Sequence, residues 1–398
     1  MSKNFDISIV GGCGHVGLPL GIAFAEAGKK VVLCDVNRDN VEKVNRKEMP
    51  FLEKRAPEAL ANVVDSGMLR ATTDKSVISR SDCVLLVVGT PLDEHQNPRI
   101  SEIIKVVEEI ADFLDEKHLV VLRSTIYPGV TRKIQPYLAN RLGRAAVAFC
   151  PERIAEGSAL EEITRLPQII SACDPQAFER AKILFSVLGT EIIELSPEEA
   201  ELAKLFTNAW RYISFAISNQ FYMIAENFGQ DFYKIYGAMV KNYPRLQGFA
   251  KAGFAAGPCL LKDTLQLSAF SKNIFFLGHA AMLINEGLPS FIVGQLKTKT
   301  SITDKVVGIL GMTFKADHDD PRDSLSYKLK KILELEAKSV LCSDFYIQEP
   351  GFLEASALVK QSNIVILATP HKAYQSLDLT GKVVVDVWNL FQKNPNNS

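Results

Sequence analysis

Apolar runs of strand length alternate with helix-forming segments over the first half of the chain. Asp6 to Val10 is a strand-like apolar run, Leu18 to Ala27 carries helix-forming residues, and Lys30 to Leu33 is a second strand-like run. The alternation continues to a last strand-like run at Glu191 to Glu194. Because strands separated by helical segments form parallel sheets, we predict a doubly wound α/β domain over residues 1–195.

A much longer helical pattern follows this domain. Ser196 and Glu199 form a capping box, apolar residues recur at helical spacing up to Phe228, and Gly229 is a typical stop. The segment spans about 32 residues, or roughly 48 Å. We predict a helix that connects two domains and contributes to a homodimer contact, within a helical region over residues 196–295.

The alternation of strands and helices returns after a polar linker at 296–303. Lys305 to Gly311 reads as a strand that enters a glycine turn, and Ser339 to Asp344 resembles Val31 to Asp35. We therefore predict a second α/β domain over residues 304–393. Because this domain lacks an intact glycine motif, we expect it to bind a ligand other than a dinucleotide.

Composition narrows the class of protein. The chain has 398 residues, of which 47% are hydrophobic and 23% charged, as in ordinary soluble proteins of two or three domains. A net charge of −1 argues against nucleic acid or an anionic membrane as partner, and we see no apolar run of membrane-spanning length. The seven cysteines form no CxxC pair, so neither a metal site nor a disulfide framework is predicted. A strand-like run so near the N-terminus argues against a signal peptide, and a reducing cytoplasm is the expected location.

The first strand-like run leads directly into a glycine motif, Gly12-Cys13-Gly14-His15-Val16-Gly17. In this context Gly12 makes the tight turn, Gly14 lets the backbone approach a pyrophosphate, and Gly17 allows close packing of the helix. Asp35 ends the second strand, where a carboxylate suits the ribose hydroxyls of NAD and repels the 2′-phosphate of NADP. The sequence thus predicts an NAD site in an α/β protein with two Rossmann-like doubly wound domains, joined by a long central helix and a helical middle region.

Polar residues follow the later strands of the first domain. Gly89 and Thr90 end one apolar run, and Thr125 ends the next. Because the carboxyl ends of parallel strands line the ligand crevice, these residues are candidate cofactor contacts, although a threonine that only caps a strand end fits equally well. Glu152 and Glu156 follow a third strand and belong either to a site or to a solvated loop.

One stretch combines the groups needed for nucleophilic chemistry. Small residues from Gly253 to Gly257 precede Cys259, and Lys262 and Asp263 follow it at three and four residues. A helix that starts at Pro258 or at the cysteine would place the thiol at the positive helix end, which favours the thiolate. A buried cysteine in a glycine-rich loop is the ordinary alternative.

Two further polar pairs are candidates for binding. Lys204 and Asn208 share one face of the long helix, where they either point inward or lie on a solvated surface. Lys315 and Arg322 lie in a charged turn of the second domain, which either contacts phosphate or is a solvated loop.

Seven segments, in order, resemble the nucleotide-sugar 6-dehydrogenases. The segments are GGCGHVGLPL, VGTP, STIYPGVT, PERIAEG, KLFTNAW, FAAGPCLLKD and FKADHDDPRDS, and together they cover nearly the whole chain. The resemblance implies an NAD domain, a long central helix and a C-terminal domain that helps to hold a nucleotide sugar. A UDP-sugar, either UDP-glucose or a UDP-N-acetylhexosamine, is the substrate it implies.

The reaction implied by the resemblance is a four-electron oxidation of a sugar CH₂OH group to a carboxylate with two NAD⁺. Cys259 would capture the intermediate aldehyde as a thiohemiacetal, and the thioester formed from it would be hydrolysed. By position in the family's motifs, the oxyanion at C6 is stabilised by Lys204 and Asn208, the water is oriented by Asp263 and Thr125, and the hydrolytic base is Glu152.

The resemblance also assigns binding residues. Glu156 and Arg322 match cofactor contacts, and Lys315 matches a lysine that binds the substrate diphosphate. The other residues assigned to the substrate are Glu152, Lys204, Asn208, Arg245, Phe249 and Gly253.

The residues before the thiol depart from the family pattern. Family members often read GGSC or GGHC, whereas this chain reads Ala256-Gly257-Pro258-Cys259. Lys262-Asp263 is more similar to the UDP-glucose and GDP-mannose branches. The alternatives are a GDP-mannose 6-dehydrogenase, a hydroxyacid dehydrogenase that releases one NADH and needs no cysteine, and a non-catalytic nucleotide-sugar-binding protein.

Overall fold

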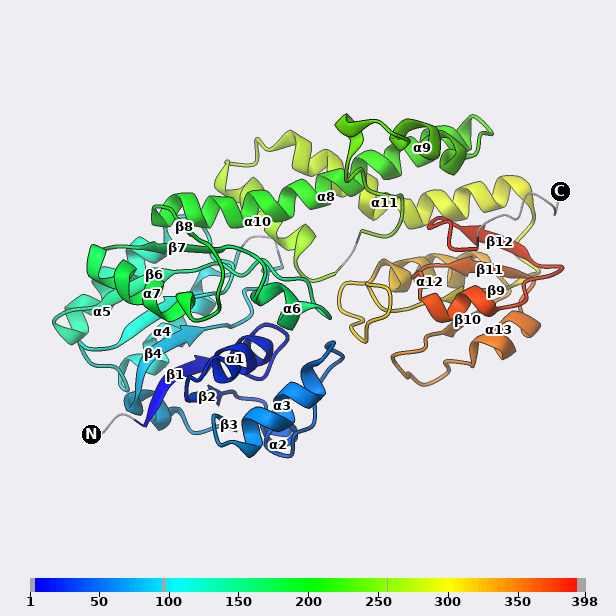
Figure 1. Cartoon of the computed structure of the whole chain (residues 1–398). Helices are drawn as coiled ribbons and strands as arrows, with labels where there is room; N and C mark the ends of the chain where they lie inside the picture. The colour runs from blue at the N-terminus through cyan, green and yellow to red at the C-terminus, as the bar shows by residue number, and fades with distance from the viewer. Residues whose placement is uncertain (1–3, 95–97, 256, 392–398) are drawn as a thin grey trace. The chain divides into compact units, whose positions relative to one another are not determined.

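The computed structural model describes residues 4–94, 98–255 and 257–391. The chain forms two compact units, Met1–Thr207 and Asn208–Ser398, whose elements are labelled in Figure 1. Each unit contains one predominantly parallel sheet. This confirms the predicted α/β class with two doubly wound sheets and a long helix.

The first unit is built on an eight-stranded sheet of order β3-β2-β1-β4-β5-β6-β7-β8. Neighbouring strands are parallel except for the antiparallel pair β6 and β7. The strand order reverses at β1, so the ligand crevice of a doubly wound sheet is expected beside this strand. The strands are β1 (Phe5–Val10), β2 (Val31–Cys34), β3 (Leu69–Thr72), β4 (Ser81–Leu86), β5 (Leu119–Leu122), β6 (Ala146–Phe149), β7 (Gln168–Ala172) and β8 (Ile192–Glu194).

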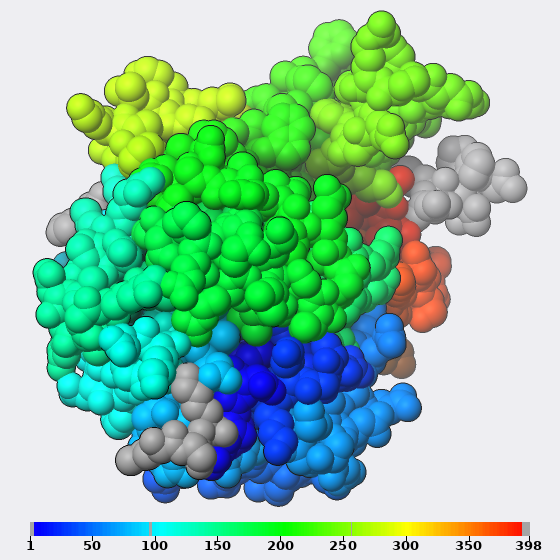
Figure 2. All heavy atoms as spheres, turned by 60° about the vertical axis from the view of Figure 1, so that its left-hand side comes forward, coloured from blue at the N-terminus to red at the C-terminus, as the bar shows by residue number. Residues whose placement is uncertain are grey.

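Side chains of the first sheet alternate between two cores. Ile7 and Ile9 of β1 belong to one core, and Val10 belongs to the other. Phe24 of α1 meets Phe185 of α7 in the first core, with ring centroids 5.6 Å apart. Figure 2 shows the green atoms of the α7 region beside the blue atoms of the N-terminal segment. The first core contains α1 (Gly17–Glu26), α2 (Arg38–Asn45), α3 (Ala56–Asp65), α6 (Ala159–Ile163) and α7 (Pro175–Ser186), and the second contains α4 (Ile100–Ala111) and α5 (Val130–Leu142).

The long helix α8 (Pro197–Asn227) starts and stops as predicted. The Ser196 backbone N–H donates to the Glu199 carboxylate at 2.8 Å, and the Glu199 backbone N–H donates to the Ser196 hydroxyl at 3.4 Å. This is the predicted capping box. Gly229 has φ of +71°, a left-handed conformation that glycine adopts without strain and that commonly ends a helix.

A carboxylate on α8 caps the start of α5. Glu201 accepts hydrogen bonds from the backbone N–H groups of Gly129 at 2.5 Å and Thr131 at 2.9 Å, and from the Thr131 hydroxyl at 2.6 Å. Burial raises the pKa of Glu201, while the three hydrogen bonds oppose that shift. The fully buried side chain thus supplies acceptors to N–H groups that a helix start leaves without intrahelical partners.

Replacing Glu201 by glutamine should lower the free energy of unfolding by about 1–3 kcal/mol at neutral pH. An amide offers one acceptor oxygen where the carboxylate offers two, so its NH₂ group faces a backbone N–H donor. Because the folded-state pKa of Glu201 is raised, the wild-type protein also loses stability as the pH rises from the unfolded-state pKa to the folded-state pKa. Urea unfolding at several pH values measures both effects, and equal stability of the two proteins throughout would contradict the capping role.

The second unit is built on a four-stranded parallel sheet of order β10-β9-β11-β12. Helices α11 and α12 share one core with the strands, and α13 belongs to a second core. These elements confirm the second predicted sheet (Figure 1). They are β9 (Val306–Leu310), β10 (Ser339–Ser343), β11 (Ile364–Leu367), β12 (Val383–Asp386), α11 (Phe276–Lys299), α12 (Leu325–Glu336) and α13 (Ala355–Gln361).

The middle of the chain is less helical than predicted. Between α9 (Phe232–Val240) and α10 (Leu260–Phe270), the described residues contain only a short 3-10 turn at Pro244–Leu246. Glycine and proline in this stretch disfavour a continuous helix. The predicted linker at 296–303 also starts too early, because buried Leu296 continues the packed face of α11.

One helix among the described residues, α11, is long and apolar enough to cross a membrane by length and composition alone. The prediction that the chain has no apolar segment of that length is therefore wrong. In this structure 39% of the apolar 18-residue stretch of α11 is buried. Its residues Leu288, Ile292 and Leu296 pack in the core beside the second sheet.

Candidate active site

The glycine motif forms a tight turn between β1 and α1. A Cβ on Gly12 would lie 2.7 Å from the Ile9 carbonyl oxygen, and a Cβ on Gly17 would lie 2.6 Å from the Gly11 carbonyl oxygen. A Cβ on Gly14 would instead meet only the Gly11 carbonyl, at 3.9 Å. The backbone at Gly14 is thus open to a ligand at the start of a helix, as a pyrophosphate requires.

Asp35 follows β2 and points at the same turn. One carboxylate oxygen accepts the Cys13 backbone N–H at 2.9 Å, and the other accepts the Asn37 backbone N–H at 2.9 Å. Asp35 is half-buried, and a carboxylate has further lone pairs for ribose hydroxyls. The open glycine turn and this acid fit an NAD molecule, with His15 and Val16 completing the turn.

Hydrogen bonds join the segments that follow two of the predicted strands. The Thr90 hydroxyl donates to the Thr125 carbonyl oxygen at 2.8 Å, and the Val88 backbone N–H donates to the Ser124 hydroxyl at 2.8 Å. The loops after β4 and β5 are therefore joined by side-chain hydrogen bonds. This places Gly89, Thr90 and Thr125 along one edge of the sheet, the carboxyl edge where ligands bind.

Glu152 lies in a buried ion pair. The Arg123 guanidinium contacts its carboxylate and also donates to the Cys150 carbonyl oxygen at 3.1 Å and to the Gln168 side-chain oxygen at 3.0 Å. Arg123 is only 1% exposed, and its guanidinium carbon lies 4.9 Å from the centre of the Phe185 ring. A solvated loop is therefore the wrong interpretation of Glu152.

Backbone groups complete the surroundings of this carboxylate. The other Glu152 oxygen accepts the backbone N–H groups of Arg153 at 2.7 Å and Ile154 at 3.0 Å. With the Arg123 contact, three of the roughly four acceptor positions of a carboxylate are filled. Glu156, in the same loop, is half-buried, and Glu53 accepts the backbone N–H of Gly157 at 2.9 Å.

The candidate nucleophile stands at the start of a helix. Cys259 is the N-cap residue of α10 and is exposed, as the first interpretation of this stretch requires. Asp263, one turn later, is fully buried. The Asn208 amide donates to one Asp263 oxygen at 2.6 Å, and the Lys262 ammonium lies 2.7 Å from the other. Lys204 lies on α8 four residues before Asn208, so both lie on one helix face.

A buried asparagine fixes the start of the loop that runs from Gly253 to Cys259. The Asn219 side chain donates to the Gly253 carbonyl oxygen at 3.0 Å and accepts the Gly253 backbone N–H at 2.8 Å. It also donates to the Asn285 side-chain oxygen at 2.9 Å. Both polar backbone groups of Gly253 are therefore hydrogen-bonded inside the protein.

Aromatic rings from the segments that follow β9 and β12 pack against the same loop. A Cβ on Gly253 would collide with the Trp388 ring, and a Cβ on Gly257 would lie 2.5 Å from the Phe314 ring. Gly257 also has φ of +98°, which suits glycine alone. Ala256, one of the departures from the family pattern, lies outside the described residues, and the other, Pro258, directly precedes Cys259.

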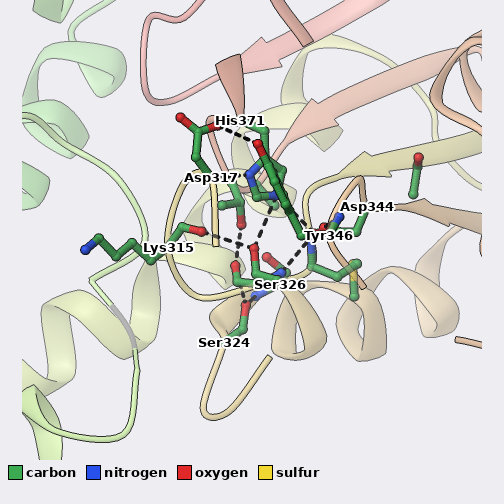
Figure 3. Close-up of polar contacts among 12 residues, drawn as sticks. Lys315, Asp317, Ser324, Ser326, Asp344, Tyr346 and His371 are labelled. Carbon is green, nitrogen blue, oxygen red and sulfur yellow. Dashed lines mark hydrogen bonds and ion pairs between the residues drawn. The ribbon is translucent and has the colours of Figure 1, made fainter. Parts of the chain in front are cut away.

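The remaining candidates lie on two loops. Arg245 stands over the Tyr243 ring at 5.6 Å, and Phe249 stacks on Tyr236 at 5.7 Å between ring centroids. In the turn after β9, the Arg322 guanidinium donates from its Nε to an Asp320 oxygen at 2.9 Å. Figure 3 shows the Lys315 side chain extending away from the polar cluster that fills this turn.

Several polar residues of these sites were missed by the sequence interpretation. Arg123 offered a signal, because a cation that directly follows the apolar run of β5 must find a partner when it is buried. Asn219 offered only a polar interruption in an apolar helix stripe. The other residues missed are Gln168, Glu201, Asn285, Asp344 and His371.

Three domain profiles of one family match the chain. They belong to the UDP-glucose/GDP-mannose dehydrogenase family and cover the NAD binding domain over residues 5–188, the central domain over residues 198–286 and the UDP binding domain over residues 308–393. The domain boundaries at residues 195, 295 and 304 stay predictions, because the profile limits do not test them.

Individual relatives are similar over nearly their full length. The UDP-N-acetyl-D-mannosamine dehydrogenase of Pyrococcus horikoshii is 27% identical over 403 residues, with 96% of each chain covered. The NDP-N-acetyl-D-galactosaminuronic acid dehydrogenase of Ralstonia nicotianae is 26% identical, with 96% of this chain and 95% of that one covered. A solved structure of a UDP-glucose dehydrogenase from Pyrobaculum islandicum has a TM-score of 0.88 at 27% identity, covering 97% of this chain and 95% of that chain.

Proposed function

Because this chain belongs to the UDP-glucose/GDP-mannose dehydrogenase family and is an NAD-dependent oxidoreductase, we propose that it oxidises the C6 hydroxymethyl group of a nucleotide sugar to the carboxylate. The observation that carries this proposal is Cys259, exposed at the start of α10 one turn before a buried aspartate. A single oxidation to an aldehyde or ketone would need no such thiol.

The first oxidation converts the alcohol to an aldehyde. When bound, NAD⁺ accepts a hydride in each of the two oxidation steps. Lys204 and Asn208 supply a cation and an amide donor from one face of α8, and these groups stabilise the oxygen at C6 as it loses its proton. Asn208 is already oriented by its hydrogen bond to Asp263.

The thiol of Cys259 carries the second half of the reaction. Its sulfur adds to the aldehyde carbon, and the carbonyl oxygen takes a proton to give a thiohemiacetal. Loss of a second hydride and a proton leaves a thioester, and water then releases the carboxylate and restores the thiol. In sum, one alcohol, two NAD⁺ and one water give one carboxylate, two NADH and three protons.

Residues around the thiol and on the loops of the first sheet suit the hydrolysis. We assign Asp263 and Thr125 to orienting the attacking water and Glu152 to accepting its proton. Glu152 retains one acceptor position beyond its contacts with Arg123, Arg153 and Ile154, which is enough to bind a water.

A UDP-sugar is the substrate we propose. The match to a UDP binding domain supports the nucleotide, and relatives that act on UDP-N-acetyl-D-mannosamine and on UDP-glucose support this class of sugar. We assign Lys315 to the diphosphate because it matches the family's lysine in the segment FKADHDDPRDS. Figure 3 shows its side chain on the turn after β9.

Counting NADH tests the proposal and separates its alternatives. A panel of UDP- and GDP-sugars is incubated singly with excess NAD⁺, and NADH and sugar acid are quantified at completion. We expect two NADH for each acid with at least one UDP-sugar. Activity with GDP-mannose alone would support a GDP-mannose 6-dehydrogenase. One NADH per substrate would indicate a simple alcohol oxidation, and binding without NADH formation would indicate a non-catalytic protein.

We also propose a homodimer in a reducing cytoplasm. Large apolar side chains of α8 are exposed in the single chain, among them Trp210, Phe221 and Ile224, and a second copy would bury such side chains. A reducing compartment keeps the Cys259 thiol available. Sedimentation at the mass of one 44.0 kDa chain would contradict the dimer.

A further inference from the structure

A fully buried histidine connects the two loops at the carboxyl edge of the C-terminal sheet. His371 follows β11 and is 0% exposed. Its Nδ1 lies 2.9 Å from the Asp317 backbone nitrogen, and its Nε2 lies 3.1 Å from an Asp344 carboxylate oxygen and 3.2 Å from the Thr313 hydroxyl. Figure 3 shows His371, Asp317 and Asp344 converging in this way.

The hydrogen-bond partners of His371 determine which ring nitrogen carries a proton. The Asp317 backbone N–H can only donate, so Nδ1 of His371 must accept and carries no proton. The opposite nitrogen, Nε2, therefore carries the proton and donates it toward the Asp344 carboxylate. A second proton on the ring would place two donors face to face, so this arrangement requires the neutral histidine.

The Asp344 carboxylate also accepts hydrogen bonds from the backbone of this turn. One oxygen accepts the backbone N–H groups of Met312 at 2.6 Å and Thr313 at 3.1 Å, and the other accepts the Tyr346 backbone N–H at 2.8 Å. Burial alone would raise the pKa of Asp344, but the hydrogen bond from His371 and those from the backbone N–H groups of Tyr346 and Met312 hold the pKa below its ordinary value. Both Asp344 and Asp35 accept backbone N–H groups, but Asp344 is buried whereas Asp35 is half-buried.

Lys315 lies in the turn that is held by the hydrogen bonds of His371. The Thr313 hydroxyl beside Nε2 donates to the Lys315 carbonyl oxygen at 3.1 Å. On the other side, Asp317 adopts φ of +54°, a left-handed conformation that aspartate adopts more readily than most non-glycine residues. Its carboxylate is fixed by the Lys372 backbone N–H at 3.0 Å and by the Tyr346 hydroxyl at 3.3 Å. The backbone is thus fixed on both sides of Lys315, whose half-buried side chain points away from this cluster (Figure 3).

We propose that His371 is a positioning residue for nucleotide-sugar binding. As the neutral Nε2–H form, it holds residues 312–317 in the one backbone shape that presents the Lys315 ammonium to the substrate diphosphate. This inference rests on the proposed function, in which Lys315 contacts the diphosphate. The lysine is then preorganised, so little ordering of the turn is needed on binding.

Substitution of His371 tests this role. His371→Ala removes both bonds, whereas the shorter amide of His371→Asn can still accept the Asp317 N–H in the place of Nδ1. We expect His371→Ala to weaken UDP binding, measured by calorimetry, and to raise the KM for the UDP-sugar, each roughly tenfold. The kcat at saturation and the affinity for NAD should change less than twofold, and His371→Asn should recover part of the loss.

His118 provides a matched control in the first unit. It is also buried, its Nδ1 accepts the Asp115 backbone N–H at 2.9 Å, and its Nε2 lies 3.2 Å from the Ile78 carbonyl oxygen. His118→Ala removes a similarly bonded imidazole far from Lys315 in sequence. Its UDP affinity should equal that of the wild type.

A direct measurement covers the case in which His371→Ala does not fold. Nitrogen–proton correlation spectra of the six histidines, assigned with His371→Asn, should show His371 as the neutral Nε2–H form, and the Asp317 amide should exchange slowly. A doubly protonated ring at neutral pH, or a folded His371→Ala that binds UDP as tightly as wild type, overturns the inference and leaves the proposed function intact. A wild-type protein that binds neither UDP nor any UDP-sugar overturns both.

Discussion

Replacing Cys259 by serine should lower the rate of sugar-acid formation at least about 10³-fold. A serine hydroxyl at the start of α10 is a far weaker nucleophile than a thiolate, so the aldehyde is no longer captured and the second oxidation stops. NAD binding should be unchanged, because the glycine turn and Asp35 belong to the first sheet. Acid is measured by chromatography, aldehyde by trapping with a hydrazine, and NAD affinity by calorimetry.

Cys173 is the matched control for this experiment. It is half-buried, and burial raises its pKa to about 11, so it is a poor nucleophile at neutral pH. Cys173→Ser should leave acid formation within about twofold of wild type, because the residue touches no proposed site. If Cys259→Ser produces acid at the wild-type rate, the covalent role of Cys259 is refuted.

The second large effect is expected on stability. Replacing Arg123 by methionine should lower the free energy of unfolding of the protein by about 3–5 kcal/mol. Methionine fills much of the space against Phe185 but leaves the Glu152 carboxylate buried without its cation and leaves the Gln168 oxygen without its donor. Chemical denaturation followed by circular dichroism measures the loss.

Two further variants isolate the ion pair. Arg132→Met removes an arginine that pairs with Glu198 on the surface of the same unit, where both side chains are exposed, and should change stability far less. The double variant Arg123→Met/Glu152→Leu removes both buried charges and should recover much of the loss, because no unpaired charge remains. The interpretation fails if Arg123→Met is as stable as Arg132→Met, or if the double variant is less stable than the single one.

The buried pair also bears on catalysis. Glu152 is assigned as the hydrolytic base, yet its position is set by Arg123 and by two backbone N–H groups of its own loop. A loss of acid formation in Arg123→Met would therefore arise through Glu152. Measuring thioester hydrolysis separately from NADH release distinguishes this effect from general unfolding.

The elements that depend on local sequence were predictable. The glycine turn, the α8 capping box and the Cys259 helix start each depend on residues within a few positions of one another, and backbone conformation at such short range follows from residue type. The two sheets were predictable for the same reason, since apolar periodicity reports which side of a strand or helix is buried. The same reasoning placed too much helix before α10, where loop conformation depends on packing against Phe314 and Trp388.

The tertiary structure alone decided how the polar groups pair. Arg123 meets Glu152 and Gln168 across 29 and 45 residues of chain, Asn219 meets Gly253 across 34, and His371 meets Asp344 across 27. Each pair forms because strands and helices distant in sequence are brought to one edge of a sheet or into one core, where an unpaired polar group would be costly. The sequence determined that the chain carries a cysteine at a helix start, an NAD-binding glycine turn and a charged turn in the second domain. Packing determined which buried side chains hold them in shape, because hydrogen-bond partners depend on distance in space and leave no period in the sequence.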